Sequence, residues 1–104
     1  MKRNEIWWAQ LPEPAGRRPV LLISRDEAIG LRRKVVVAEI TTTVRALPTE
    51  VVVGAREGLE RRSVVTTENL FTIPKEWLHE RVGSLSRVKI DAVDDALRFA
   101  LDLE

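Results

Sequence analysis

The chain has 104 residues, of which 44% are hydrophobic and 32% charged, and its formal net charge is +1. This size and composition predict one globular domain over residues 1–104, and no apolar run approaches the roughly 20 residues of a membrane-spanning helix. The chain has no cysteine and one histidine, which excludes disulfides, thiolate zinc sites, cysteine nucleophiles and multi-histidine metal sites. Chemistry must come from Arg, Lys, Glu, Asp, Ser and Thr, and we expect no cofactor. The N-terminus lacks a signal-peptide pattern, so we expect a cytoplasmic protein.

Charge is divided unevenly along the chain. Residues 1–63 carry 12 Lys/Arg and 8 Asp/Glu, whereas residues 64–104 carry 5 and 8, so the two balances are +4 and −3. A basic first part favours a polyanionic partner, although ordinary solvated surfaces can show the same asymmetry.

The first two thirds of the chain have the composition of short strands separated by turns. Val, Ile, Thr and Trp are concentrated in five segments bounded by Pro, Gly or charged residues, namely 5–11, 18–24, 34–41, 49–54 and 62–73. The continuous apolar run within 34–41 is typical of a strand covered on both faces. Residues 25–34 predict a charged connection with a short helical turn, and 46–49 and 54–60 predict hairpin loops.

The C-terminal segment changes to a helical period. Ser86 is suited to the N-cap position, and one apolar stripe contains Ile90, Val93, Leu97, Ala100 and Leu101. A second apolar set falls on roughly the opposite face and contains Val88, Ala92, Phe99 and Leu103. We expect one face to pack on the sheet and the other to form a subunit interface, unless its last members only cover a fraying end. Strands followed by one helix predict a mainly β domain with a small, strongly curved sheet.

Two adjacent arginines precede a proline at the start of a predicted strand. Pro19 disfavours helical geometry at Arg18, so the side chain of Arg18 should project in a defined direction from the mouth of the strand. A guanidinium offers a planar fork of donors that fits two phosphate oxygens. The alternative is that Arg17 and Arg18 are solvated loop residues, or that one pairs with a local carboxylate such as Glu13.

Three threonines end the third predicted strand. Thr41 and Thr43 share one side of the strand and Thr42 lies on the other, so hydroxyls that could donate to a phosphate stand near Arg45. Threonine is also a good strand former, which accounts for the run without a ligand.

The histidine and the paired tryptophans have structural explanations. His79 lies in a predicted turn before the last helix and should be an exposed surface residue. Trp7 and Trp8 must point to opposite sides of the first strand, so one should fill the core while the other lies on the surface, where it could stack on a base or contact a subunit.

Taken in order, these pieces resemble the MazF/PemK family of toxins. The likeness is carried by NEIWWAQL, EPAGRRPVLLIS, VVVAEITT and SVVTTENLFTIPKEWL, the last followed by RVGSLS and an amphipathic helix. The resemblance implies an SH3-like plicated barrel of the CcdB/PemK type with a C-terminal helix. It further implies a homodimer that acts as a sequence-specific, metal-independent endoribonuclease toxin of a type II toxin–antitoxin pair.

The resemblance also assigns the catalytic residues. The Arg before Pro and the Thr that ends the third strand are the family's catalytic pair, and they fall on Arg18 and Thr41. The family's loop glutamate matches Glu13 by spacing, although LPEP replaces the common GSEQ form. Asn4 stands where a glycine is usual, and Phe71, within ENLFT, stands where a basic residue is common; these departures bear more on RNA preference than on the reaction.

A reaction without metal is consistent with this residue inventory. The RNA 2'-OH can attack the adjacent phosphate and leave a 2',3'-cyclic phosphate and a 5'-OH, with Arg18 stabilising charge and Thr41 holding the phosphate. Glu13 and assisted solvent both stay open as the base. DNA should be spared because it lacks the 2'-OH.

Recognition is expected on unpaired bases of single-stranded RNA. The candidates for RNA contacts are Arg17, Thr42, Thr43, Arg45 and Asn69, in a groove that a cognate antitoxin would also occupy. Two alternatives remain, namely a CcdB-like toxin that inhibits DNA gyrase by protein binding, and a non-catalytic SH3-like interaction module.

Overall fold

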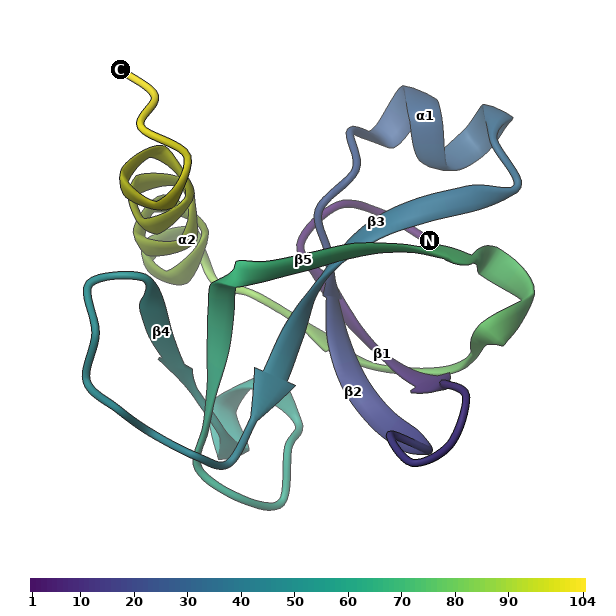
Figure 1. The fold of residues 1–104 in the computed structure, drawn as a ribbon, viewed down its shortest axis with the longest axis horizontal. Helices are drawn as coiled ribbons and strands as arrows, with labels where there is room; N and C mark the ends of the chain where they lie inside the picture. Colours follow the sequence, from purple (N-terminus) through teal and green to yellow (C-terminus); the bar gives the residue numbers. More distant parts are fainter.

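The backbone forms one curled antiparallel sheet with two helices packed against it (Figure 1). A computed structural model describes all 104 residues. The six strands lie in the order β4-β5-β3-β2-β1-β6, and their bounds are β1 (Glu5–Gln10), β2 (Arg17–Leu22), β3 (Lys34–Thr41), β4 (Glu50–Val53), β5 (Ser63–Pro74) and β6 (Leu78–Ser84). The helical segments are α1 (Asp26–Leu31), η1 (Ala55–Glu57), η2 (Lys75–Trp77) and α2 (Arg87–Ala100). This curled half-barrel with a C-terminal helix confirms the predicted fold class.

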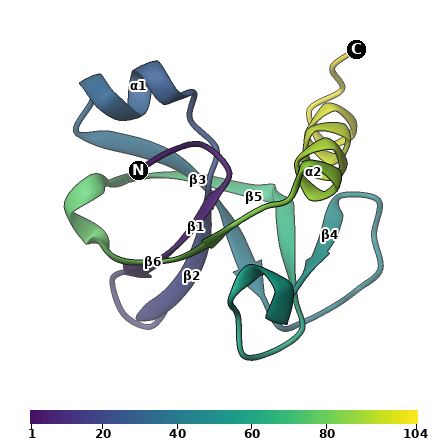
Figure 2. The same cartoon turned by 180° about the vertical axis from the view of Figure 1, so that it is seen from behind.

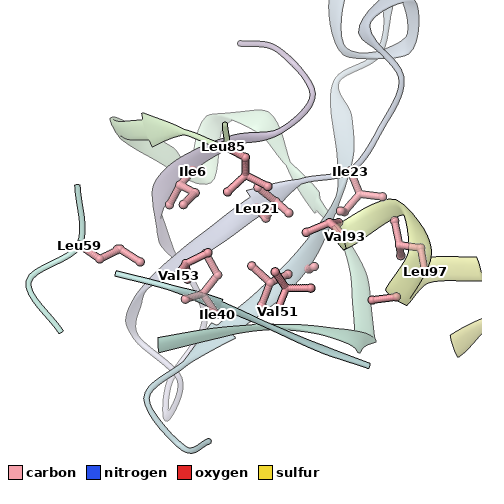
Figure 3. Packing of buried hydrophobic residues seen from close by; sticks show 13 residues of the cluster. Ile6, Leu21, Ile23, Ile40, Val51, Val53, Leu59, Leu85, Val93 and Leu97 are labelled. Carbon is pink, nitrogen blue, oxygen red and sulfur yellow. The ribbon is translucent and has the colours of Figure 1, made fainter. Parts of the chain in front are cut away.

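The helices cover opposite faces of the central strands. In β3, Val35 and Val37 join Ile29 of α1 in one buried cluster, whereas Ala38 and Ile40 belong to a second cluster that includes residues of α2. Figure 3 shows the second cluster, in which side chains of the sheet such as Leu21 and Val51 lie beside Val93 of α2. The apolar run of β3 is therefore covered on both faces, as predicted.

Helix α2 is capped and oriented much as its sequence predicts. Ser86 Oγ accepts a hydrogen bond from Lys89 N–H at 3.4 Å, and the helix buries Val93, Ala96 and Leu97. Two expected positions are wrong: Ala92 packs against the core, and Leu101 is 51% exposed because the helix ends at Ala100. The other apolar face is open, with Val88, Phe99 and Leu103 exposed. None of the helices is long and apolar enough to cross a membrane.

One strand was not predicted. The five predicted strands end within two residues of their expected bounds, but the predicted turn around His79 is the strand β6. It pairs only with β1, at the edge of the sheet, and three consecutive polar residues of β6, His79, Glu80 and Arg81, are exposed. Charged residues are common on edge strands, because they discourage pairing with another chain. His79 itself is exposed, as expected.

Candidate active site

A proline opens the sheet between the ends of β2 and β3. Ile23 N–H donates to Val36 O of β3, and backbone groups alternate along a strand, so Pro19 also turns its backbone toward β3. Proline has no N–H to donate there, and the paired residues of β2 and β3 stop at Val20 and Glu39. Beyond this point the two strands separate and frame a cleft.

Arg18 and Thr41 stand on the two sides of this opening. Val20 pairs with Glu39, so continuing the antiparallel register by two residues sets Arg18 opposite Thr41, on the same face of the sheet. Both residues line a cleft of about 450 Å³, together with Arg17, Trp8, Pro19, Ile40, Thr42, Gly58, Leu59, Glu60, Arg61 and Ser63. The structure thus brings together the two residues that the family resemblance pairs as catalytic, although they lie 23 positions apart in the sequence.

The guanidinium of Arg18 is oriented by the loop before it. Its Nε donates to Ala15 O at 3.0 Å, and no residue of the chain accepts a hydrogen bond from its two terminal nitrogens. A guanidinium held by one edge in this way keeps its two terminal nitrogens available to bind two oxygens of one phosphate.

Thr41 offers a free hydroxyl proton at the end of β3. Its Oγ1 accepts a hydrogen bond from Thr43 N–H at 3.2 Å, which fixes the oxygen and leaves the O–H free to donate. Thr42 follows it on the cleft lining and is exposed. The end of β3 therefore supplies neutral donors opposite the charged ones of β2.

Arg17 is engaged within the cleft. Its guanidinium carbon lies 4.1 Å from the centroid of the Trp8 ring, and its Nη2 lies 3.5 Å from Glu80 Oε1 of β6. The Arg17 side chain is 55% exposed, so both contacts are weak enough to exchange for a ligand. Trp8 is half-buried on the cleft wall, and Trp7 packs against the cluster under α1. The two tryptophans occupy opposite sides of β1, as predicted.

A predicted hairpin loop to which the sequence analysis gave no role in the site forms the far wall of the cleft. Residues 58–61 follow η1 and contribute Leu59, Glu60 and Arg61 to the lining; Figure 1 shows this loop beside the end of β3. Two glycines hold it there: a Cβ on Gly58 would lie 2.7 Å from Val82 O, and one on Gly83 would lie 2.3 Å from Glu57 O. Gly58 also has φ of 94°, which other residues rarely adopt. The charged sequence EGLERR was the available signal for this wall.

Glu13 lies beside the cleft rather than in it. It is exposed in the β1–β2 loop and is not a lining residue. Its carboxylate oxygens lie 3.7 Å from the position of a Cβ on Gly16, next to Ala15, which holds Arg18. Glu13 thus folds over the turn that orients the arginine, without pairing to it.

The remaining candidates for RNA contacts lie outside the cleft lining. Thr43 and Arg45 are exposed in the loop after β3, where Arg45 N–H donates to Glu50 Oε1 at 2.9 Å. Asn69 is exposed on β5, and its Nδ2 donates to Glu39 Oε1 at 3.2 Å. Glu39 lies on the same face of β3 as Thr41, and Asn69 is bonded to Glu39. Asn69 therefore extends the row of polar side chains that begins at Thr41.

A carboxylate at the start of β1 anchors the neighbouring edge strand. Burial acts to raise the pKa of Glu5, but hydrogen bonds from the Trp7 indole, Lys2 N–H and Arg81 outweigh it, so the pKa lies below its ordinary value. The Arg81 bond, 3.0 Å from Nε to Oε2, joins β6 to β1 one residue from Glu80. Glu27 on α1 also has a lowered pKa, through its own backbone N–H and then Arg25.

The chain has no arrangement of side chains suited to a metal ion. No three His, Cys, Asp or Glu residues cluster as metal ligands would. The cleft instead carries three guanidiniums against the single carboxylate of Glu60. Its charge suits an anionic ligand.

Comparison with known proteins places this geometry in one family. The chain matches the PemK-like, MazF-like toxin of type II toxin–antitoxin systems over residues 2–101. It is 39% identical over 101 residues to the probable endoribonuclease MazF5 of Mycobacterium tuberculosis, covering 96% of this chain and 92% of that one. It is 36% identical over 111 residues to endoribonuclease EndoA of Bacillus subtilis, covering 99% and 96%.

Solved structures agree in fold. The Mycobacterium tuberculosis toxin MazF-mt6 superposes with a TM-score of 0.89 at 41% identity, covering 96% of this chain and 98% of that one. A mycobacterial endoribonuclease solved in complex with its cognate antitoxin gives a TM-score of 0.89 at 26% identity, covering 100% and 97%. The chain belongs to the PemK-like, MazF-like toxin family.

Proposed function

We propose that the protein is a sequence-specific, metal-independent endoribonuclease toxin of a type II toxin–antitoxin pair. The observation that carries the proposal is the opening at Pro19, where Arg18 and Thr41 face each other across one cleft. The named relatives are the probable endoribonuclease MazF5 and the endoribonuclease EndoA, and both match along almost the whole chain.

The reaction uses the RNA's own 2'-OH as the nucleophile. Its attack on the adjacent phosphorus forms the P–O2' bond and breaks the P–O5' bond, which leaves a 2',3'-cyclic phosphate and a 5'-OH. The 2'-OH gives its proton to a base, and the leaving O5' takes a proton from the Arg18 guanidinium or from solvent. The terminal nitrogens of Arg18 stabilise the extra negative charge of the phosphorane, and Thr41 O–H donates to a phosphate oxygen to fix its position. Donors already held in place need little reorganisation, which lowers the barrier.

The base that accepts the proton of the 2'-OH must be a group other than Arg18. Arginine is a poor general base because its pKa exceeds about 12. Glu13 is the proposed base because it lies on the turn whose Ala15 carbonyl holds Arg18. Assisted solvent is the alternative base. A substrate that drew the β1–β2 loop over the cleft would bring the Glu13 carboxylate toward the 2'-OH.

RNA recognition extends from the cleft along the sheet. Arg17 can exchange Glu80 for a phosphate, which uncovers the Trp8 ring for a base to stack on. Thr42, Thr43, Arg45 and Asn69 supply further polar contacts on the β3 end, its loop and β5. Such contacts read unpaired bases, so the substrate is single-stranded RNA.

The same proposal includes two protein partners. The open face of α2, with Phe99 65% and Val88 77% exposed, is suited to a contact with a second copy of the chain. A cognate antitoxin is proposed because a related endoribonuclease was solved with one. Sedimentation of the purified protein should give a dimer, and a monomer at every concentration would contradict the first part.

The competing functions are less well supported. A gyrase inhibitor or an interaction module needs no oriented guanidinium opposite a free hydroxyl, whereas the cleft contains both. The relatives described above are endoribonucleases, which also favours the nuclease over the CcdB-like alternative.

Incubation with a long RNA in EDTA tests the proposal. We expect discrete fragments from the RNA, no fragments from DNA of the same sequence, and none from RNA with Arg18→Ala. No cleavage by the wild-type protein, or cleavage that stops with the chelator, would overturn it.

A further inference from the structure

A second cleft lies at the opposite end of β3 from the candidate active site. It has a volume of about 590 Å³ and is formed where α1 turns into β3 and β5 turns into η2. Figure 2 shows these two turns side by side, away from the C-terminal end of β3. Four of the six residues that line it are cations, Arg32, Arg33, Lys34 and Lys75, and the others are Pro74 and Glu76. We call these four cations the basic cluster.

The backbone of the basic cluster is held by hydrogen bonds, while three of its four cationic side chains form no ion pair. Lys75 N–H donates to Arg33 O at 2.8 Å, Lys34 pairs with Pro74, and Lys75 Nζ donates to Ile29 O. Arg32, Arg33 and Lys34 are exposed, and none of them takes part in the chain's six ion pairs. Glu76 is the single carboxylate on the lining against these four cations, and it forms no ion pair with them. The excess of adjacent positive charges is repulsive, and a polyanion would relieve that repulsion.

We propose that the basic cluster binds the phosphate backbone of RNA at a distance from the bond that is cut. The inference rests on the proposed endoribonuclease function and adds a second contact for the same substrate. A protein partner would be expected to find apolar or aromatic anchors, and this cleft has none besides Pro74. Phosphates need only charge and donors, which the cluster supplies.

The spacing of the two sites sets the length of RNA that can use both. From Lys34 to Thr41, β3 advances seven residues, or about 23 Å at 3.3 Å per residue. This is close to the width of the molecule, whose principal extents are 31 × 30 × 24 Å. An RNA must therefore continue for several nucleotides beyond the cleft to reach the basic cluster. A short oligonucleotide engages the cleft alone, and a long RNA is held at both.

Binding of a long RNA by matched charge variants tests the proposal. Arg32→Ala/Arg33→Ala is compared with Lys2→Ala/Arg25→Ala, which also removes two exposed cations but leaves the cluster intact. Both pairs are placed in an Arg18→Ala background, so that the RNA is not cut during the titration. Thermal unfolding of both variants confirms that each is folded.

The cluster variant should bind a long RNA about tenfold more weakly at 0.1 M salt, because two phosphate contacts are lost. The slope of log affinity against log salt should fall by about 1.4, at about 0.7 for each contact to a single strand. The Lys2→Ala/Arg25→Ala control should keep both values, and a short oligonucleotide should not distinguish the two variants.

Two results would overturn the proposal. One is an unchanged affinity and salt slope for long RNA in the cluster variant. The other is unchanged RNA binding with lost binding of a polyglutamate peptide, which would make the cluster a protein-docking site. Since the readout is binding, a wild-type protein that cuts no RNA would overturn the proposed function without altering either result.

Discussion

The two ends of β3 carry similar charge but hold it differently. At the Thr41 end, Arg18 donates to a backbone carbonyl, so its guanidinium has a set position. Arg17 beside it lies over Trp8 in contacts weak enough to exchange for a ligand. At the Lys34 end, Arg32 and Lys34 project into solvent without partners. Chemistry requires donors held at the place where charge develops, whereas binding of a polyanion requires only that charge be near.

This difference separates two kinds of mutational effect. Loss of a positioned donor at the cleft should lower the rate of the chemical step. Loss of a free cation at the basic cluster should lower affinity and salt dependence alone. Three substitutions in the cleft test that distinction, and a fourth, at Glu5, tests stability; their expected effects decrease from the first to the last.

The largest effect is expected from Arg18→Ala. Removal of one preorganised donor to a transition-state oxyanion costs about 10²–10³ in kcat, and here the donor is also charged. Arg18→Lys should recover little, because an ammonium cannot reproduce the planar fork held at Ala15 O. Single-turnover cleavage of RNA measures both variants. A parental rate for either would remove Arg18 from the mechanism.

Thr41→Val should lower kcat by about 10- to 100-fold, since it removes a neutral donor and keeps the shape and strand propensity of the side chain. Thr72→Val is the matched control, because Thr72 is exposed on β5 away from the cleft lining. Cleavage kinetics compare the pair. Equal losses in the two variants would show that the effect is structural.

Arg17→Ala should raise KM by about five- to tenfold and leave kcat within about twofold of the parental value. Arg17 is engaged by Trp8 and Glu80 and is proposed to contact the RNA backbone rather than the reacting phosphate. Steady-state kinetics on one RNA separate the two parameters. A large fall in kcat at unchanged KM would exchange the roles assigned to Arg17 and Arg18.

Glu5→Gln should have the smallest effect, and it should act on stability. Because the folded state lowers the pKa of Glu5, its charged bonds stabilise the fold above the unfolded pKa and are lost as the pH falls through the folded value. The variant should lose about 1 kcal/mol of unfolding free energy at pH 7. That difference should shrink below about pH 4. Urea denaturation at both pH values measures it, and a difference that grows in acid would contradict the assignment.

Much of the fold was visible in the sequence because its strands obey local rules. The third strand is buried on both faces, so its run of Val and Ile identified it with its observed bounds. Strand β6 was missed because an edge strand needs neither β-branched residues nor an apolar face, and Leu78 is its only buried residue. Ala92 was misplaced because its environment depends on the tilt of α2, which the helical period does not specify.

The candidate site also has one part that the sequence indicated and one part that it did not. Pro19 and the threonine run marked the two strand ends as candidate phosphate sites, and the resemblance to the MazF/PemK family singled out Arg18 and Thr41 there. The wall formed by Leu59 and Arg61 could not be predicted, because it depends on the close approach of Gly58 to β6. Long-range contacts of this kind leave no periodic pattern.

In the proposed mechanism the 2'-OH of the RNA attacks the adjacent phosphorus, while the Arg18 guanidinium stabilises the developing charge opposite the Thr41 hydroxyl. Once a cleavage site has been mapped, a synthetic RNA with a single 2'-deoxy nucleotide immediately before the scissile phosphate tests it directly. We predict no cleavage at that bond, and a 2',3'-cyclic phosphate with a 5'-OH on the fragments of the unmodified RNA. Cleavage of the deoxy substrate at the parental rate would show that the 2'-OH is not the nucleophile.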